Sequence, residues 1–348
     1  MNEINNANQG GNKKIILWLF TGAIMVYSMV IIGGITRLTG SGLSITEWNV
    51  ISGTLPPLNH DEWVESFEKY KQFPEYQKKN SGMQLGEYKK IFFWEYFHRL
   101  IGRTIGIVFI IPFLWFYFTR QLYKSLTRKL LIIFSLGGLQ GFMGWYMVKS
   151  GLVNLPYVSH YRLSIHFFLA LTLIVVILIT ALSEMGVKRV KSSTDAKLLL
   201  YLILLLTIVQ TFYGTLTAGL KAGFGYNTFP DMNGEWIPAS VVLFKPAWIN
   251  LFDNGTMVQF LHRWLGITLF FVAGASLYYT YRTKKNTNLI TGNLLLFLAI
   301  TAQALLGIFT LIYKVPISLG VIHQGFAIIV VCTNIYLIYI TRYKSIAD

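Results

Sequence analysis

The chain has 348 residues, of which 54% are hydrophobic and 13% are charged. This composition excludes an ordinary soluble domain and is typical of a helical protein that crosses a membrane several times. The net charge of +15 does not indicate a nucleic-acid partner, because the basic residues cluster between apolar runs and the sequence carries no nucleic-acid-binding motif. The single cysteine, Cys332, lies in an apolar run and excludes an intrachain disulfide.

Eight apolar stretches approach or exceed the length of about 20 residues that a membrane-spanning helix needs. They cover residues 15–34, 91–118, 130–148, 160–184, 197–219, 256–281, 289–313 and 319–341. We interpret the first, which begins at Ile15, as a retained helix and not as a cleaved signal. The expected fold is an all-α integral membrane protein with eight transmembrane helices.

Basic residues predict the orientation of these helices. They concentrate in the short segments before span one and after spans two, four, six and eight: Lys13, Lys14, Arg120, Lys124, Arg128, Lys129, Lys188, Arg189, Lys191, Lys197, Arg282, Lys284, Lys285, Arg342 and Lys344. The positive-inside rule places these segments and both termini in the cytoplasm, and the long segments 36–90 and 220–255 outside. We therefore expect a multi-pass protein of the inner or cytoplasmic membrane, surrounded by lipid. In the first long segment, Trp63, Phe67 and Tyr70 recur at helical spacing and predict an amphipathic helix.

The chain repeats itself. The phrase Glu95–Gly102, with His98, matches the phrase Gln259–Gly266, with His262, and a Gln-x-x-x-Gly pattern occurs in both span three and span seven. We therefore predict two pseudo-symmetric four-helix bundles. The expected divisions are a cytoplasmic tail over 1–14, a first bundle over 15–190 with its outer loop at 35–90, and a second bundle over 191–348.

Four histidines lie near the outer ends of the even-numbered spans: His98, His166, His262 and His323. Each half offers one pair at one depth, and two imidazoles on facing helices can hold a heme iron from both sides. A single intramembrane histidine is often only an interhelical hydrogen-bond partner, but four at matched depth favour a metal-binding role. No carboxylate cluster indicates zinc or a di-iron centre instead.

The two halves differ beside these histidines. Glu95 shares a helix face with His98, whereas the second copy has the neutral Gln259. This difference suggests that the first half performs proton-coupled chemistry, with Glu95 as the catalytic residue, while the second holds a permanent redox cofactor. The alternative, compatible with it, is a Glu95–Arg99 ion pair at the helix start. Arg99 and Arg263 are candidates for binding heme propionates, or for reaching the membrane interface.

These phrases resemble the heme A synthase family, of the type found in mitochondria and related bacteria but without outer-loop cysteine pairs. The similar phrases cover residues 33–39, 41–44, 70–75, 95–99, 144–152, 226–230, 256–263 and 323–324, within nearly the whole chain. The resemblance implies oxidation of the C8 methyl of heme O to a formyl group by successive hydroxylations, giving heme A for terminal oxidases. It also implies heme b on His262 and His323, the heme O substrate at His98 and His166, and the important glutamate at Glu95.

The partners that follow are heme O synthase, which would hand over the substrate, and the assembly of cytochrome oxidase, which would receive the product. A homo-oligomer stays open. The outer segments are expected to form a lid over the heme sites, held by Trp63, Trp236 and Trp248. The alternatives are a two-heme cytochrome b for electron transfer and a heme chaperone or transporter. The glutamate beside only one histidine pair disfavours the cytochrome.

Overall fold

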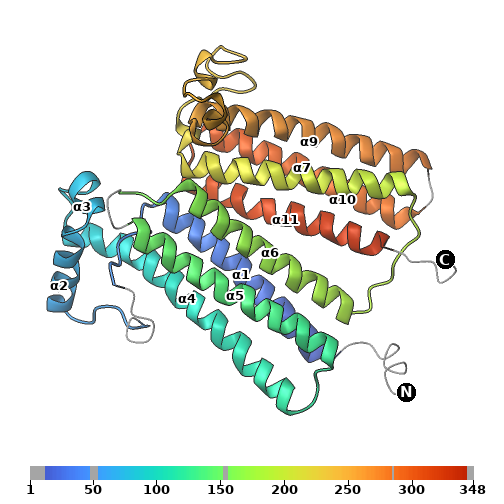
Figure 1. Ribbon diagram of the computed structural model, residues 1–348, viewed down its shortest axis with the longest axis horizontal. Coiled ribbons are helices and arrows are strands. Elements are labelled where there is room, and N and C mark those ends of the chain that lie inside the picture. Colours follow the sequence, from blue (N-terminus) through green and yellow to red (C-terminus); the bar gives the residue numbers. More distant parts are fainter. Residues whose placement is uncertain (1–11, 48–53, 152–155, 284–285, 343–348) are drawn as a thin grey trace. The chain divides into compact units, whose positions relative to one another are not determined.

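The computed structural model describes residues 12–47, 54–151, 156–283 and 286–342, and over this part of the chain it contains helices and no β-strand. Eight of the described helices are long and apolar enough to cross a membrane, as the sequence predicts. They are α1 (Lys13–Leu38), α4 (Leu85–Phe118), α5 (Lys124–Gly151), α6 (His160–Glu184), α7 (Thr194–Gly219), α9 (Gly255–Thr283), α10 (Thr287–Ile312) and α11 (Ile317–Thr341) (Figure 1). The all-α multi-pass membrane fold is therefore confirmed.

Several helices begin earlier than their apolar stretches. Helix α4 begins at Leu85 instead of near residue 91, and α5 begins at Lys124 instead of near residue 130. Hydropathy falls where charged residues begin, but lysine and glutamate are good helix formers, so the helical hydrogen bonds continue through them. At the start of α4 the Glu87 carboxylate accepts the backbone N–H of Gln84 at 3.0 Å, which caps the extra turn.

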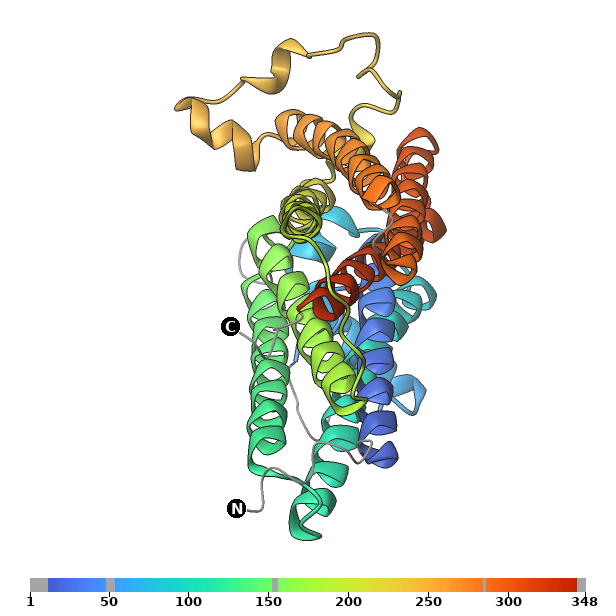
Figure 2. The ribbon, with the colours of Figure 1, turned by 90° about the vertical axis from the view of Figure 1, so that its right-hand side faces the viewer.

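The chain divides into two compact units. The first unit comprises residues 24–173, and the second comprises the described residues up to 23 together with those from 174 onward. In the second unit α7 packs against α9, α9 against α10, α10 against α11, and α11 against α7, so four helices close a ring (Figures 1 and 2). Its buried core is Leu200, Ile203, Leu269, Ala273, Leu289, Leu296, Ile300, Val330, Leu337, Ile338 and Ile340. A boundary between two bundles near residue 190 stays a prediction.

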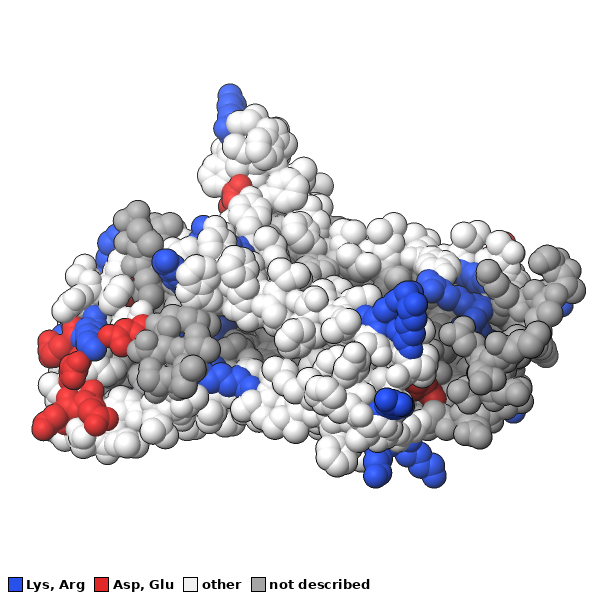
Figure 3. Space-filling model, turned by 60° about the horizontal axis from the view of Figure 1, so that its bottom comes forward, with Lys and Arg blue, Asp and Glu red and all other residues white. Residues whose placement is uncertain are grey.

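The segment between α1 and α4, which the sequence predicts to lie outside and which we call the first outer segment, carries helices α2 (His60–Lys71) and α3 (Pro74–Lys79). The amphipathic helix that the sequence predicts is α2: Phe67 and Tyr70 are buried and belong to one apolar cluster with residues of α4. The Trp63 ring lies edge-on to Phe92 of α4, with 4.9 Å between ring centroids. The exposed side of α2 is acidic, and Figure 3 shows Asp and Glu side chains gathered at the left of the surface. The outer segment is thus fixed to the start of α4 by aromatic packing.

The second outer segment contains the short helices η2 (Ala222–Phe224), η3 (Ala239–Val241), η4 (Ala247–Ile249) and α8 (Asn250–Asp253), and Figure 2 shows it extending beyond the ends of α7 and α9. The expectation that tryptophans hold this segment is wrong, because Trp236 and Trp248 are 61% and 62% exposed. Buried amides hold it instead. The Asn250 side chain accepts the N–H groups of Leu243 and Phe244 at 2.8 and 2.9 Å. Such fully paired amides fix irregular backbone without an apolar core.

Candidate functional site

Each of the four intramembrane histidines lies against a glycine of the preceding spanning helix. The pairs are His98 with Gly33 of α1, His166 with Gly144 of α5, His262 with Gly214 of α7, and His323 with Gly307 of α10. A Cβ atom added to these glycines would lie 3.2, 3.4, 3.0 and 2.8 Å, respectively, from Cε1 of the imidazole. Three of these four separations are shorter than an ordinary van der Waals contact. The absence of a side chain therefore lets each ring lie flush against the neighbouring helix.

The spacing of the second histidine pair fits an iron between its rings. The ring centroids of His262 and His323 are 6.4 Å apart, and the ring planes are nearly perpendicular at 86°. An imidazole nitrogen binds a metal at about 2.0–2.1 Å, so two rings on opposite sides of one iron have centres roughly 6 Å apart. His98 and His166 also lie close enough for an electrostatic interaction. The residues present therefore fit a heme held by two histidines.

The hydrogen bonds around the rings agree with a ligand role. Nδ1 of His262 pairs with the backbone carbonyl of Gln210 at 3.1 Å, which orients this ring. The Nδ1 atoms of His98, His166 and His323 are buried without a partner among the described residues. Buried polar atoms without partners are rare, so each of these three rings has one nitrogen that the described protein groups do not satisfy. Within the same residues no three His, Cys, Asp or Glu side chains are grouped, so these histidines occur as pairs and not as part of a larger cluster.

A glutamine lies one helical turn before three of the four glycines: Gln140, Gln210 and Gln303. In α1 the equivalent residue, one turn before Gly33, is Met29. The equivalence is also spatial, because Met29 lies 3.6 Å from the Cβ position of Gly102, and Gln210 lies 3.2 Å from that of Gly266. The environment of His98 is therefore less polar on this side than that of His262.

Glu95 is the centre of a buried polar cluster at the outer end of α4. Its side chain is 3% exposed. Its Oε2 accepts from the Ser44 N–H at 2.7 Å, the Ser44 hydroxyl at 2.8 Å and the Ile45 N–H at 2.9 Å. Its Oε1 accepts from Nη2 of Arg99 at 2.6 Å, which confirms the ion pair that the sequence suggests. Both oxygens are thus compensated for their burial, and the carboxylate fixes the backbone that follows α1.

In the second half, Gln259 and Arg263 fix an irregular backbone segment in a similar way. The Gln259 amide and Nη2 of Arg263 both donate to the carbonyl of Tyr226, at 2.9 and 2.8 Å. Nη1 of Arg263 donates to the carbonyls of Thr228 and Asp231, each at 2.6 Å. Arg99 similarly donates to the carbonyls of Glu47 and Ile45 at 2.9 Å. In both repeats, therefore, the residues three before and one after the histidine fix an outer segment beside that histidine.

The family of cytochrome oxidase assembly proteins termed COX15-CtaA matches residues 16–335 of the chain. This chain belongs to that family. It is 43% identical over 335 residues to the protein of Flavobacterium psychrophilum named heme A synthase, with 94% of this chain and 98% of the relative covered. It is 44% identical to the heme A synthases of Bradyrhizobium diazoefficiens, covering 90% of this chain and 87% of the relative, and of Rhodopseudomonas palustris, covering 91% and 86%.

In this member of the COX15-CtaA family the arginines already have partners. The donors of Arg99 and Arg263 named above go to backbone carbonyls and to Glu95, so propionate binding by either residue would need donors beyond these or an exchange of partners. The propionate contacts stay a prediction. The part that Arg99 and Arg263 play in fixing the outer segments was not apparent from the sequence, because it depends on backbone carbonyls far away along the chain.

The sequence also did not single out Glu75, a second buried carboxylate in the outer part of this COX15-CtaA protein. Glu75 follows Pro74 in the first turn of α3 and is only 4% exposed. Burial raises the pKa of Glu75 to about 7, with a further increase from the negative charge of Glu95 and opposing effects from Lys79 and Tyr70. The sequence did contain a signal. Glu75 lies between Phe73 and Tyr76, and aromatic neighbours on both sides suggest a buried position.

Proposed function

We propose that this protein is a heme A synthase, which oxidises the C8 methyl group of heme O to a formyl group by successive hydroxylations. One observation carries the proposal: two histidine pairs are built alike against glycines, and only one of them has a buried carboxylate beside it. Membership of the COX15-CtaA family and the name of the relatives support the same activity. A protein that only stored or carried heme would need no such difference between its halves.

In this proposal His262 and His323 hold a resident heme b. The ring spacing and the hydrogen bond from Nδ1 of His262 to the Gln210 carbonyl support a permanently occupied site, because an oriented imidazole is a better ligand. When bound, this heme supplies one-electron redox chemistry. Gly214 and Gly307 let the two rings approach their helices, so the protein determines where the ligand nitrogens lie.

His98 and His166 hold the substrate heme O in the first half. Neither Nδ1 of this pair has a partner among the described residues, whereas in the second pair His262 has one and His323 has none, and Met29 replaces a glutamine beside His98. A ligand with fewer supporting hydrogen bonds binds iron less firmly, which suits a substrate that must enter and leave. Glu95, one turn before His98, accepts protons as the methyl group is oxidised. Arg99 and Ser44 keep this carboxylate in place between turnovers.

We further propose that both termini and the basic segments face the cytoplasm. In the second unit the segment after α6 lies at the end of α11, where the Val190 N–H donates to the Ile340 carbonyl at 2.8 Å and Nη1 of Arg189 donates to the Arg342 carbonyl at 3.1 Å. Basic residues from distant parts of the chain thus share one end of the unit. Heme O would arrive from heme O synthase within the membrane, and heme A would pass to the assembly of cytochrome oxidase.

The test is to express the chain in cells that make heme O but no heme A, and to compare it with the His262→Ala and His98→Ala variants. The wild type should yield heme A. His262→Ala should lose the low-spin b-type spectrum, whereas His98→Ala should keep it and accumulate heme O. Heme O unchanged in wild-type cells that contain the folded, heme-loaded protein would reject the activity. An unchanged spectrum in His262→Ala would reject the assignment of the resident site.

A further inference from the structure

Glu75 and Glu95 are the two carboxylates that are buried within the described residues, and both lie at the outer end of the first unit. Glu75 is not a simple surface ion pair. Its Oε2 accepts a hydrogen bond from the Tyr70 hydroxyl at 3.2 Å, and its Oε1 lies 3.6 Å from Nζ of Lys79. The Tyr70 hydroxyl in turn accepts from the Asn80 amide at 2.8 Å. A carboxylate buried with so few donors holds a proton more readily than one in water.

The groups that face Glu75 come from three helices. Tyr70 belongs to α2, Lys79 belongs to α3 itself, and Glu95 acts on Glu75 from α4. Tyr88 of α4 stacks on Tyr70 with 5.2 Å between ring centroids, and its hydroxyl donates to the Ser44 carbonyl at 3.3 Å, beside the Glu95 cluster. The two carboxylates are therefore electrostatically coupled. They differ in their partners, because Glu95 has an arginine and backbone N–H groups whereas Glu75 has a tyrosine and a more distant lysine.

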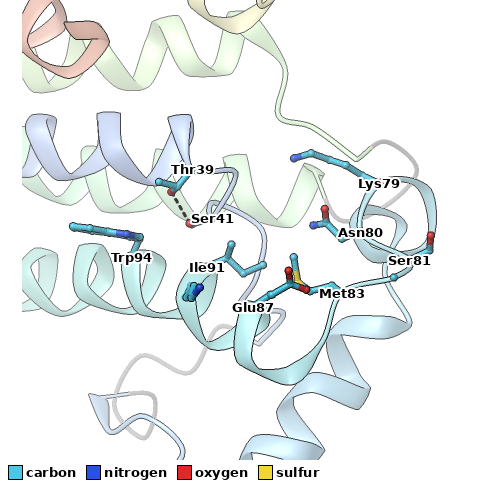
Figure 4. A pocket seen from close by; sticks show the side chains of 11 residues that line it. Thr39, Ser41, Lys79, Asn80, Ser81, Met83, Glu87, Ile91 and Trp94 are labelled. Atoms are coloured by element: carbon cyan, nitrogen blue, oxygen red, sulfur yellow. Dashed lines mark hydrogen bonds between the residues drawn. The ribbon is translucent and has the colours of Figure 1, made fainter. Parts of the chain in front are cut away.

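An open polar pocket of about 690 Å³ is lined by neighbours of both carboxylates, but by neither Glu75 nor Glu95 itself. Its lining comes from the outer end of α1, the turn between α3 and α4, and the first turns of α4 (Figure 4). Lys79 and Asn80, which belong to the surroundings of Glu75, line it together with Ile91 and Trp94, which precede Glu95 on α4. Ser41 and Thr39 also line it, with their hydroxyls 2.7 Å apart. Water in this pocket can reach Lys79, which pairs with Glu75, and Asn80, which donates to Tyr70.

We propose that Glu75 is the outer proton acceptor of the reaction, which takes protons from Glu95 and releases them to water in this pocket. The inference rests on the proposed function. Oxidation of a methyl to a formyl group removes hydrogen from the carbon, so protons must leave a buried site with each turnover. In the proposed step an O–H bond of protonated Glu95 breaks, a proton passes through water, and an O–H bond forms on Glu75. No electron moves in this step, and the negative charge returns to Glu95.

The experiment measures heme A formation by the full-length, heme-loaded protein between about pH 6 and about pH 9. In the wild type the rate should rise with pH through about 7, because only the ionised Glu75 accepts a proton. Glu75→Gln keeps an acceptor for Tyr70 but cannot take a proton. It should lower the rate at least about 10-fold and abolish the rising limb, with the resident heme spectrum unchanged. The matched control is Glu68→Gln, an exposed carboxylate of α2 that pairs with Lys71 and does not line the pocket, which should leave both the rate and its rise with pH unaltered.

A second variant tests the same residue without replacing it. Lys79 lowers the pKa of Glu75, so Lys79→Met should move the rise of the rate to higher pH. If the rate in Glu75→Gln still rose with pH as in the wild type, with or without a uniform loss of rate, Glu75 would have a merely structural role. Either result would overturn the proposal. An unmoved limb in Lys79→Met would overturn it as well. Absence of heme A from the wild-type protein at every pH would instead reject the proposed function, and the inference with it.

Discussion

Replacing Gly307 by alanine should displace His323 and weaken binding of the resident heme. The added Cβ would lie 2.8 Å from Cε1 of the imidazole, a separation that neighbouring side chains essentially never show. In the proposed heme-bound protein this ring would also be held by the iron, so it could not move away freely. Either the ring moves off the iron axis or α10 and α11 separate, and both loosen the site.

The expected size follows from the packing. Overfilling a close-packed interior costs about 1–3 kcal/mol. If that cost falls on the liganded state, heme affinity drops about 5- to 150-fold. The effect should be graded, because the corresponding Cβ contact is 3.0 Å at Gly214 but 3.4 Å at Gly144, which is an ordinary contact distance. Gly141→Ala is the matched control, since nothing lies within 4 Å of its Cβ position.

The assay is the heme b content per purified protein, together with the reduced low-spin spectrum, over a series of heme concentrations. Gly307→Ala should show the largest loss, Gly214→Ala a smaller one, and Gly141→Ala none. Full heme content and an unaltered spectrum in Gly307→Ala would refute the reasoning. So would an equal loss in Gly141→Ala, because the effect would then come from helix backbone changes and not from contact with the ring.

Three further predictions concern charge and orientation. Glu95→Gln should reduce heme A formation by about 10²–10⁴-fold while heme b stays bound, and a native rate would leave Glu95 with only its structural contacts. Burial raises the pKa of Glu75 from 4.5 to about 7, so ionising this carboxylate destabilises the folded protein. This destabilisation is absent below about pH 4.5 and reaches its full size above about pH 7. Glu75→Gln should therefore raise the melting temperature at pH 8 but not at pH 4, by an amount corresponding to on the order of 3 kcal/mol, and an equal change at both values would contradict this. Reporter fusions after Lys79 and after Lys191 should report opposite sides of the membrane, and the same side for both would exclude the proposed orientation.

The sequence was sufficient to predict the spanning helices and to place the four histidines within them. Hydropathy identifies helices that must satisfy all backbone hydrogen bonds internally, and a histidine inside such a helix is conspicuous. The Gln-x-x-x-Gly pattern was visible as a repeat, but its purpose was not. Only the structure places Gly144 and Gly307 against His166 and His323.

Features that depend on contacts between distant segments could not be predicted. Glu75 is in a charged stretch, and its burial arises because α2 and α3 pack on α4 through aromatic residues. The roles of Gln259 and Arg263 depend on carbonyl groups of irregular backbone, which leave no pattern in side-chain chemistry. Trp236 suggested an anchor by composition alone, yet its exposure shows that composition does not determine which large residues are packed.

The central claim is that this chain converts heme O to heme A, and the most direct measurement uses the purified full-length protein. Heme O is added to the protein with its resident heme under oxidising conditions, and the extracted porphyrins are identified by mass and visible spectrum. The account predicts a formyl-bearing heme A that accumulates with time in the wild type and is lost in Glu95→Gln. Recovery of all added heme O unchanged, with the resident heme intact, would contradict the account and favour an electron-transfer cytochrome or a heme carrier.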